Sequence, residues 1–421
     1  MTKAPLQLPK YSIGVGDRFA LQGKAQLQAC VLALESGIEV VPVWNKSNRE
    51  HLIVGSEPSE TQRAADAAVA ELKWPHGYFL DADHIGLKTV DRFIAPCDFF
   101  TIDVADKIGA PAEASEVRAF ADRHPELMAE IALGSSGLRQ KAGREVLENV
   151  ARKYLAAIQE AGKIYRYIAE RKGTGQFVPE ISMDETDSPQ TPLELLIILA
   201  AIADERIPIQ TIAPKFTGRF NKGVDYRGDV DAFTREFTAD LAVVAHGVRN
   251  YDLPANLKLS VHSGSDKFSL YRPIQRAITD AGAGLHLKTA GTTWLAELAG
   301  LALAGGAGLE LAKEIYVSAC EHMEELCAPY ASVIEIDRDK LPSSDAVGGW
   351  SSQEYFDALN HDAKCRSYNA DFRQLLHVSF KMAAKMGKRF TDAVKENEGL
   401  ISRGVTENLF ERHIRPVFVA D

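Results

Sequence analysis

The chain has 421 residues, of which 46% are hydrophobic, 25% charged and 8% aromatic. These are ordinary globular proportions, so they exclude a mainly disordered, collagen-like or coiled-coil architecture. Lys and Arg total 48 against 58 Asp and Glu, a formal net charge of -10. The chain therefore lacks the basic surplus that nucleic acid or an anionic membrane surface would attract, and we expect a small-molecule partner.

Cysteine usage and the N-terminus both predict a cytoplasmic protein. The five cysteines are odd in number and form no Cys-x-x-Cys pair, which is typical of reduced thiols. The N-terminal MTKAPLQLPKYSIG lacks an apolar signal segment, and the longest apolar run, 195–203, is about half of a bilayer span. We expect neither export nor membrane insertion, and the sequence leaves a homo-oligomer open.

Short apolar runs bounded by Gly, Pro or Asp predict eight strands, several of them followed by helical patterns. The predicted strands are 11–17, 38–44, 77–82, 98–104, 176–183, 207–213, 257–262 and 284–289. Eight strands with intervening helices indicate an α/β fold of the (β/α)₈ TIM-barrel type. A doubly wound open sheet is the main alternative, but its Gly-x-Gly-x-x-Gly dinucleotide turn is missing.

Two segments exceed a minimal barrel. Residues 107–175 predict a helical insertion between the fourth and fifth strands, and residues 294–421 predict a helical C-terminal extension packed on the barrel. The barrel core, with its insertion, would then span 1–293. Either segment could form a lid or an oligomer contact, and ordinary packing accounts for both equally well.

Alternation along the strands directs many polar side chains into the lumen, because successive residues of a strand face opposite ways. In FVPEISMDE, the apolar Ile181 and Met183 should face helices, which turns Glu180, Ser182 and Asp184 inward. The same pattern predicts inward side chains at Asp81, Asp83, Thr101, Asp103, Lys258, Ser260, His262, His286 and Lys288. Burying so many ionisable groups is costly unless they pair, bind a metal or contact a substrate. Internal ion pairs, such as Lys258 with Glu180, are the purely structural interpretation.

The active sites of such barrels lie at the C-terminal strand ends, which selects His84, Glu185 and His262. Two imidazoles and a carboxylate form an open site suited to Mn, Ni, Co, Fe or Zn, so we expect a divalent metal cation. Asp225, in the loop after the sixth strand, is a candidate carboxylate ligand beside His84 and His262. Asp83 and Glu185 are placed to act as an acid/base pair.

The loop after the sixth strand is also rich in cations within an acidic chain. Its 13 residues from 215 to 227 contain Lys215, Arg219, Lys222 and Arg227. Such a loop attracts an anionic substrate unless it is simply solvated. The turns after the seventh and eighth strands, SGSDK and TAGTTW, could hold a carboxylate or phosphate on backbone N–H groups. Plausible contributors there are Lys267, Lys288 and Thr292.

Five strings resemble the tagaturonate epimerase family of bacterial hexuronate catabolism: FLDADHIGLKTVDRF, EISMDETDSPQTP, IAPKFTGRFNKGVDYRGD, LSVHSGSDKFSLY and LHLKTAGTTWLAE. The resemblance covers roughly residues 75–300. It implies a (β/α)₈ barrel, a divalent metal and interconversion of D-tagaturonate with D-fructuronate. By position it further implies Asp83 as proton acceptor, Glu185 as proton donor, and His84, Asp225 and His262 as metal ligands, with Asp184 competing with Glu185.

The implied chemistry leaves two routes open. The inverted carbinol lies two carbons from the ketone, so inversion can proceed by retro-aldol cleavage and re-addition or through enediols. Both routes need a Lewis acid and two proton-transfer groups. The uronate carboxylate would be held through Arg219 or Lys215.

Two alternative functions stay open. The first is a metal-dependent aldolase or epimerase of a phosphorylated ketose. The second, from a different class, is a catalytically inactive sugar-acid binding protein.

Overall fold

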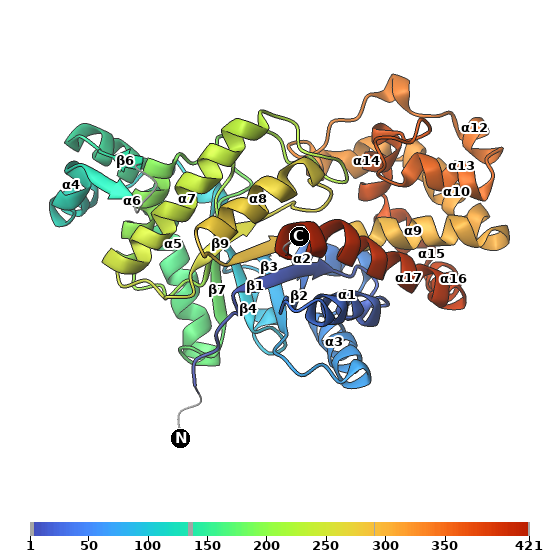
Figure 1. Cartoon of the computed structure of the whole chain (residues 1–421), viewed down its shortest axis with the longest axis horizontal. Helices are drawn as coiled ribbons and strands as arrows, with labels where there is room; N and C mark the ends of the chain where they lie inside the picture. The colour runs from blue at the N-terminus through green and yellow to red at the C-terminus, as the bar shows by residue number, and fades with distance from the viewer. Residues whose placement is uncertain (1–3, 134–137, 290, 420–421) are drawn as a thin grey trace.

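The computed structural model describes residues 4–133, 138–289 and 291–419, and its centre is a closed barrel of eight parallel strands (Figure 1). The strands are β1 (Tyr11–Gly16), β2 (Val41–Ser47), β3 (Phe79–Ile85), β4 (Phe99–Asp103), β7 (Val178–Ser182), β8 (Thr211–Ala213), β9 (Lys258–Val261) and β10 (Leu285–Lys288). Their order around the barrel is β1-β10-β9-β8-β7-β4-β3-β2. The predicted α/β barrel is confirmed, and each of the eight predicted strands overlaps an observed one.

Two predicted strands end too early. β2 runs from Val41 to Ser47 rather than over 38–44, and β3 continues to Ile85 rather than ending at residue 82. The residues missed are mostly polar, with Asn45, Lys46 and Ser47 in β2 and Asp83 and His84 in β3. A search for apolar runs stops at such residues, although they belong to the strand.

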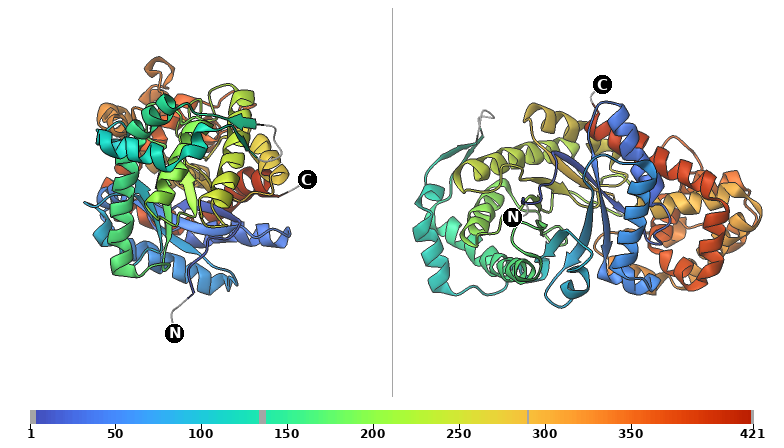
Figure 2. Two further views of the ribbon diagram at one scale, coloured as in Figure 1. Left: turned by 90° about the vertical axis from the view of Figure 1, so that its left-hand side faces the viewer. Right: turned by 90° about the horizontal axis from the view of Figure 1, so that it is seen from below.

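Helices surround the barrel and bury their apolar faces against it (Figure 2). Those that follow the strands are α1 (Gly23–Glu35), α2 (Asn48–Val54), α3 (Pro58–Leu72), α6 (Pro192–Asp204), α7 (Val230–Asn250), α8 (Phe268–Asp280) and α9 (Thr292–Ala304). A short 3₁₀ turn, η1 (Val90–Phe93), follows β3. Local sequence explains their starts: α6 begins at a Thr191–Glu194 capping box with Pro192 at its first position.

The insertion between β4 and β7 is mostly helical but contains a small hairpin that the sequence pattern did not predict. Its elements are η2 (Ala105–Lys107), α4 (Ala114–Arg123), η3 (Pro125–Met128), β5 (Ile131–Leu133), β6 (Leu138–Gln140) and α5 (Arg144–Lys172). β5 and β6 pair antiparallel. α5 packs against β4 and α6, so it forms part of the ring of barrel helices. α4 packs against α5, and β5 contacts α7, so this outer part of the insertion lies at one end of the long axis (Figure 1).

The C-terminal region is helical and lies at the opposite end of the molecule's long axis (Figure 1). It contains α10 (Gly306–Glu321), α11 (Met323–Cys327), η5 (Ala328–Tyr330), η6 (Arg338–Lys340), α12 (Ser344–Gly348), α13 (Ser352–Leu359), α14 (Ala370–Val378), α15 (Phe380–Met386), α16 (Lys388–Glu396), α17 (Glu398–Leu409), η7 (Phe410–Ile414) and α18 (Arg415–Phe418). α17 packs against α1 and α9, and α18 packs against α8. The chain end thus returns to the barrel wall.

In the part of the chain that the structure describes, no helix combines the length and apolarity needed to cross a bilayer. The cysteines are unpaired thiols, and Cys30 and Cys97 are buried.

Candidate active site and metal centre

The C-terminal end of β3 brings two consecutive residues to the barrel mouth. The pairing of β3 with β4 shifts register between Ala82 and Ile85, and His84 has a φ of 51°. A regular strand would turn Asp83 and His84 to opposite faces, whereas a bulge re-aims one of them. Asp83 Oδ1 lies 3.9 Å from His84 Nε2. The two side chains therefore face the same space.

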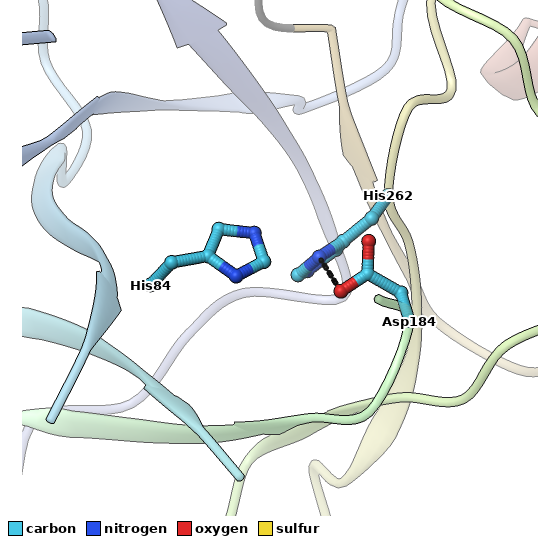
Figure 3. Close-up of side chains that lie close together, drawn as sticks. All are labelled: His84, Asp184 and His262. Atoms are coloured by element: carbon cyan, nitrogen blue, oxygen red, sulfur yellow. Dashed lines mark ion pairs between the residues drawn. The ribbon is translucent and has the colours of Figure 1, made fainter. Parts of the chain in front are cut away.

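The two predicted imidazoles meet there. The ring centroids of His84 and His262 are 5.4 Å apart, at an interplanar angle of 74°. Asp184, just beyond β7, joins them: its Oδ1 is 3.2 Å from His262 Nδ1 (Figure 3). One ligand atom from each of these three residues lies within 4.8 Å of the others, close enough to hold one metal ion.

Each imidazole also contacts a second carboxylate. His84 Nδ1 is 2.9 Å from Asp103 Oδ2, and His262 Nε2 is 2.8 Å from Glu180 Oε1. When these nitrogens donate, His84 Nε2 and His262 Nδ1 become the ligand atoms. Carboxylates that orient histidines in this way are typical of metal centres. The donor set of the described residues therefore fits a divalent cation.

Without a metal, the carboxylates keep both imidazoles protonated. Burial favours the neutral form of His262, but Asp184 and Glu180 raise its pKa to about 9. For His84, Asp83 and Asp103 likewise outweigh burial and raise the pKa well above its usual value. Metal binding must displace these protons.

Below the imidazoles, Lys288 joins three carboxylates. Its Nζ lies 2.7 Å from Asp81 Oδ2, 2.8 Å from Asp83 Oδ1 and 3.2 Å from Glu180 Oε1, and it donates to Thr101 Oγ1 at 2.6 Å. The predicted internal ion pairing is thus present, with Lys288 as its cation. Lys258 instead donates to the backbone oxygens of Leu8 and Pro9.

The network sets different protonation states on neighbouring groups. Burial raises the pKa of Asp81 to about 6. Burial also opposes ionisation of Asp83, but Lys288 and His84 prevail and lower its pKa to about 2. The three carboxylates raise the pKa of Lys288 well above its usual value against burial. Gly14 makes room for this lysine, because a Cβ there would lie 2.8 Å from Lys288 Cγ.

The other predicted acid, Glu185, is an exposed residue at the same rim. Glu185 forms a second group with His84 and Asp103, whose ligand atoms also lie within 4.8 Å of one another. Asp83 and Glu185 are therefore both neighbours of His84.

Asp225 lies in neither of these groups, which were sought among the described residues. Its Oδ1 accepts from Ser269 Oγ at 2.9 Å and from the Tyr226 N–H at 2.7 Å. It is therefore engaged at the start of α8, and Asp184 occupies the position beside the imidazoles that the sequence analysis assigned to Asp225.

The predicted substrate-binding residues are scattered. Only Lys288 belongs to the network just described. Lys215 donates to the Thr186 backbone oxygen, and Arg219 pairs with Glu335 at the surface. Lys267 donates to the backbone oxygens of Asn221, Val224 and Ser265, and Thr292 donates to Asn408 Oδ1.

Sequence reasoning missed three contributors to the mouth. Asp103 was expected in the lumen but without a role, and neither Arg18 nor His377 was singled out as a site residue. His377 lies on α14 and packs against the loops after β8 and β10, because a Cβ on Gly223 or Gly291 would contact its ring. No local pattern marks it, since α14 is over 80 residues from the last barrel strand.

Comparison with known proteins identifies the family. A family model described as tagaturonate epimerase matches residues 2–415. A tagaturonate/fructuronate epimerase from Thermotoga maritima is 27% identical over 96% of this chain and 80% of its own length. A glycerol-complexed fructuronate-tagaturonate epimerase from Cohnella laeviribosi is 25% identical, with a TM-score of 0.81 over 99% of this chain and 83% of that one. The native structure of the Cohnella enzyme matches the fold with a TM-score of 0.79 at 24% identity, over 98% of this chain and 83% of that one. The chain belongs to the tagaturonate epimerase family and is an isomerase.

Proposed function

We propose that the chain interconverts D-tagaturonate and D-fructuronate with a divalent cation held by His84, Asp184 and His262. The observation that supports this most directly is the pair of imidazoles, each backed by its own carboxylate and both beside Asp184. In this ligand set Asp184 takes the place of Asp225, the carboxylate ligand expected from the sequence. A bound cation would act as a Lewis acid that polarises the substrate ketone.

Proton transfer falls to Asp83 and Glu185. Asp83 is ionised at neutral pH, because Lys288 and His84 hold its pKa near 2 against burial, so it is in the form that accepts a proton. Glu185 is exposed and can exchange protons with water. Together they place two exchangeable carboxylates beside His84.

The retro-aldol route can use Asp83 and Glu185 for its two proton transfers. A base removes the proton from the hydroxyl on the carbon to be inverted, and the bond to the carbon next to the ketone breaks. This gives an aldehyde and an enediolate that keeps the electron pair. Rotation of the aldehyde presents its other face, the C–C bond re-forms, and the oxygen takes a proton back. The enediol route would use the same two carboxylates for exchange at carbon.

Lys288 is not suited to form an imine with the ketone. Imine formation needs a neutral amine, whereas Asp81, Asp83 and Glu180 keep this group an ammonium ion. Its three donors are engaged by the carboxylates and Thr101. We propose that Lys288 instead orients the Asp83 carboxylate.

The test compares substrates and removes the proposed ligand. The purified protein should epimerise D-tagaturonate, lose activity in EDTA and regain it with Mn²⁺. His262→Ala should lose bound metal, as measured by elemental analysis, together with activity. His76→Ala is the matched control, because His76 lies in the loop that precedes β3, at the other rim.

Three results would contradict the proposal in different ways. Activity that survives both EDTA and His262→Ala would remove the metal. Exclusive turnover of a ketohexose phosphate would assign the chain to the alternative substrate class. Metal binding and sugar-acid binding without epimerisation would instead identify an inactive binding protein.

A further inference from the structure

The loop between β8 and α7 contains four cations, and three of them are engaged by other protein groups. Arg219 and Arg227 both pair with Glu335, at 3.1 Å and 2.8 Å, and all three side chains are about half exposed. Lys215 donates to a backbone oxygen. For the fourth, Lys222, the described residues provide its Nζ with neither a hydrogen bond nor an ion pair.

The backbone around Lys222 is held on both sides. Lys267 Nζ donates to the oxygens of Asn221 and Val224, at 2.8 Å and 2.7 Å. Arg373 Nε donates to the oxygen of Gly223 at 2.6 Å, and the Lys222 N–H donates to Val333 at 2.8 Å. The two buried cations thus donate hydrogen bonds to the carbonyl oxygens of this loop. Because the backbone is held in this way, the Lys222 side chain is preorganised.

Lys222 lies within electrostatic range of the candidate metal site and of a second cation. The charges of Glu185 and Asp184 act on it, and so does that of Arg18. Its Nζ lies 5.7 Å from the centre of the Tyr330 ring, which belongs to the C-terminal region. The ammonium group is therefore within electrostatic reach of Asp184, one of the residues that would hold the metal.

Arg18, in the loop after β1, has one hydrogen-bond donor without a partner among the described residues. Its guanidinium pairs with Glu50 and stacks on Phe380, with Cζ 4.0 Å from the ring centre. Its Nε is buried and has no partner among the described residues. The Nε2 atom of His377 is also buried and has no hydrogen-bond partner among the described residues. The charges of both Lys222 and Arg18 act on this imidazole.

We propose that Lys222, with Arg18 Nε as a second donor, binds the carboxylate of the sugar-acid substrate. Leaving cationic donors unpaired at a partly buried site costs free energy unless an anion accepts their hydrogen bonds. A carboxylate offers two oxygens and can accept from both groups. A substrate anchored there would extend its ketone and hydroxyl groups toward His84, Asp184 and His262. This inference rests on the proposed function and identifies the group that makes the site select an acid.

The experiment measures the preference for an acid over its neutral counterpart. Binding of D-tagaturonate and of D-tagatose, in which CH₂OH replaces the carboxylate, is measured by calorimetry on Mn²⁺-loaded protein. Lys222→Met should weaken D-tagaturonate binding roughly 10- to 100-fold, as expected for a lost charge-assisted hydrogen bond, and leave D-tagatose binding unchanged. KM for D-tagaturonate should rise more than kcat falls.

Two variants control for charge and for fold. Arg227→Met removes a cation from the same loop but from its surface pair, and should bind both sugars as the wild type does. Lys222→Arg keeps a cation and should recover most of the preference. Mn²⁺ stoichiometry and circular dichroism should match the wild type in every variant, so that lost binding reflects the carboxylate alone.

The outcomes separate this inference from the proposed function. If wild-type protein epimerises D-tagaturonate and Lys222→Met keeps the full acid preference, the inference is overturned and the function stands. Equal losses for D-tagaturonate and D-tagatose would overturn it as well. If the wild type does not epimerise D-tagaturonate, the proposed function fails, and the acid preference in binding still decides the role of Lys222.

Discussion

His84 owes its place at the barrel mouth to an irregular backbone. A non-glycine residue with a φ of 51° costs free energy, of order 1 kcal/mol or more, and persists only where its surroundings hold it. Here the bond from His84 Nδ1 to Asp103 and the bulge in β3 hold it. As a result, the side chains of Asp83 and His84 both reach the site, although the two residues are adjacent in sequence.

Glu185 should matter for turnover rather than for binding. Glu185→Gln keeps the size of the side chain and removes its proton-transfer capacity, so we expect kcat to fall roughly 10²-fold. Metal content and the circular dichroism spectrum should stay unchanged. Asp187→Asn, two residues further along the same loop, is the matched control and should keep its kcat. Unchanged kcat in Glu185→Gln would remove Glu185 from the proton transfer.

Metal affinity should rise with pH. Since Asp184 and Glu180 raise the pKa of metal-free His262 to about 9, binding between pH 6 and pH 8 must release its proton. Each released proton contributes up to about a tenfold gain in affinity per pH unit. Mn²⁺ titration followed by electron paramagnetic resonance should therefore give a dissociation constant at least about tenfold lower at pH 8 than at pH 6. A constant value would show that His262 is not a ligand or is already neutral.

At the scale of elements, a buried arginine helps to attach the loop after β8 to the C-terminal region, beside the Lys222–Val333 backbone bond and the pairs with Glu335. Arg373 on α14 donates to Gly223, to the Leu359 oxygen at 2.6 Å and to Asp266 Oδ2 at 2.5 Å. It thereby joins the loops after β8 and β9 to the end of α13. Lys267, expected to touch the substrate, also joins the loop after β9 to the loop after β8.

Removing this arginine should destabilise the fold. Arg373→Met leaves the buried Asp266 carboxylate without its main partner, so we expect the free energy of unfolding to fall by about 3 kcal/mol. Arg338→Met is the control: its pair with Glu324 is exposed, and its loss should cost less than about 1 kcal/mol. Urea unfolding followed by circular dichroism compares them. Equal, small losses would show that the attachment is dispensable.

At the scale of the whole molecule, the C-terminal helices contribute to the barrel mouth. His377 on α14 touches the loops after β8 and β10. The outer part of the insertion, around α4 and the β5–β6 hairpin, lies at the other end of the long axis (Figure 1). The mouth carries charges of both signs. Asp184 and Glu185 stand there beside the imidazoles, and Lys222 lies within electrostatic range of these carboxylates and of Arg18.

The sequence by itself determined the eight strands, the polar side chains of their inner faces and the family. These follow from the alternation of residues within short segments and from long strings such as FLDADHIGLKTVDRF, which need no knowledge of distant contacts. The two imidazoles could be paired because both stand at strand ends, and all C-terminal ends of a parallel barrel share one rim.

Only the tertiary structure decided which partners each group meets. Asp184 rather than Asp225 stands beside the imidazoles, because Ser269 and the Tyr226 N–H engage Asp225. Lys222, among four similar loop cations, is the one whose ammonium group pairs with none of the described residues, while residues far along the chain hold the backbone beside it. Alternation specifies the face on which a side chain lies, but loop conformation and packing between distant segments set the distances on which binding and catalysis depend.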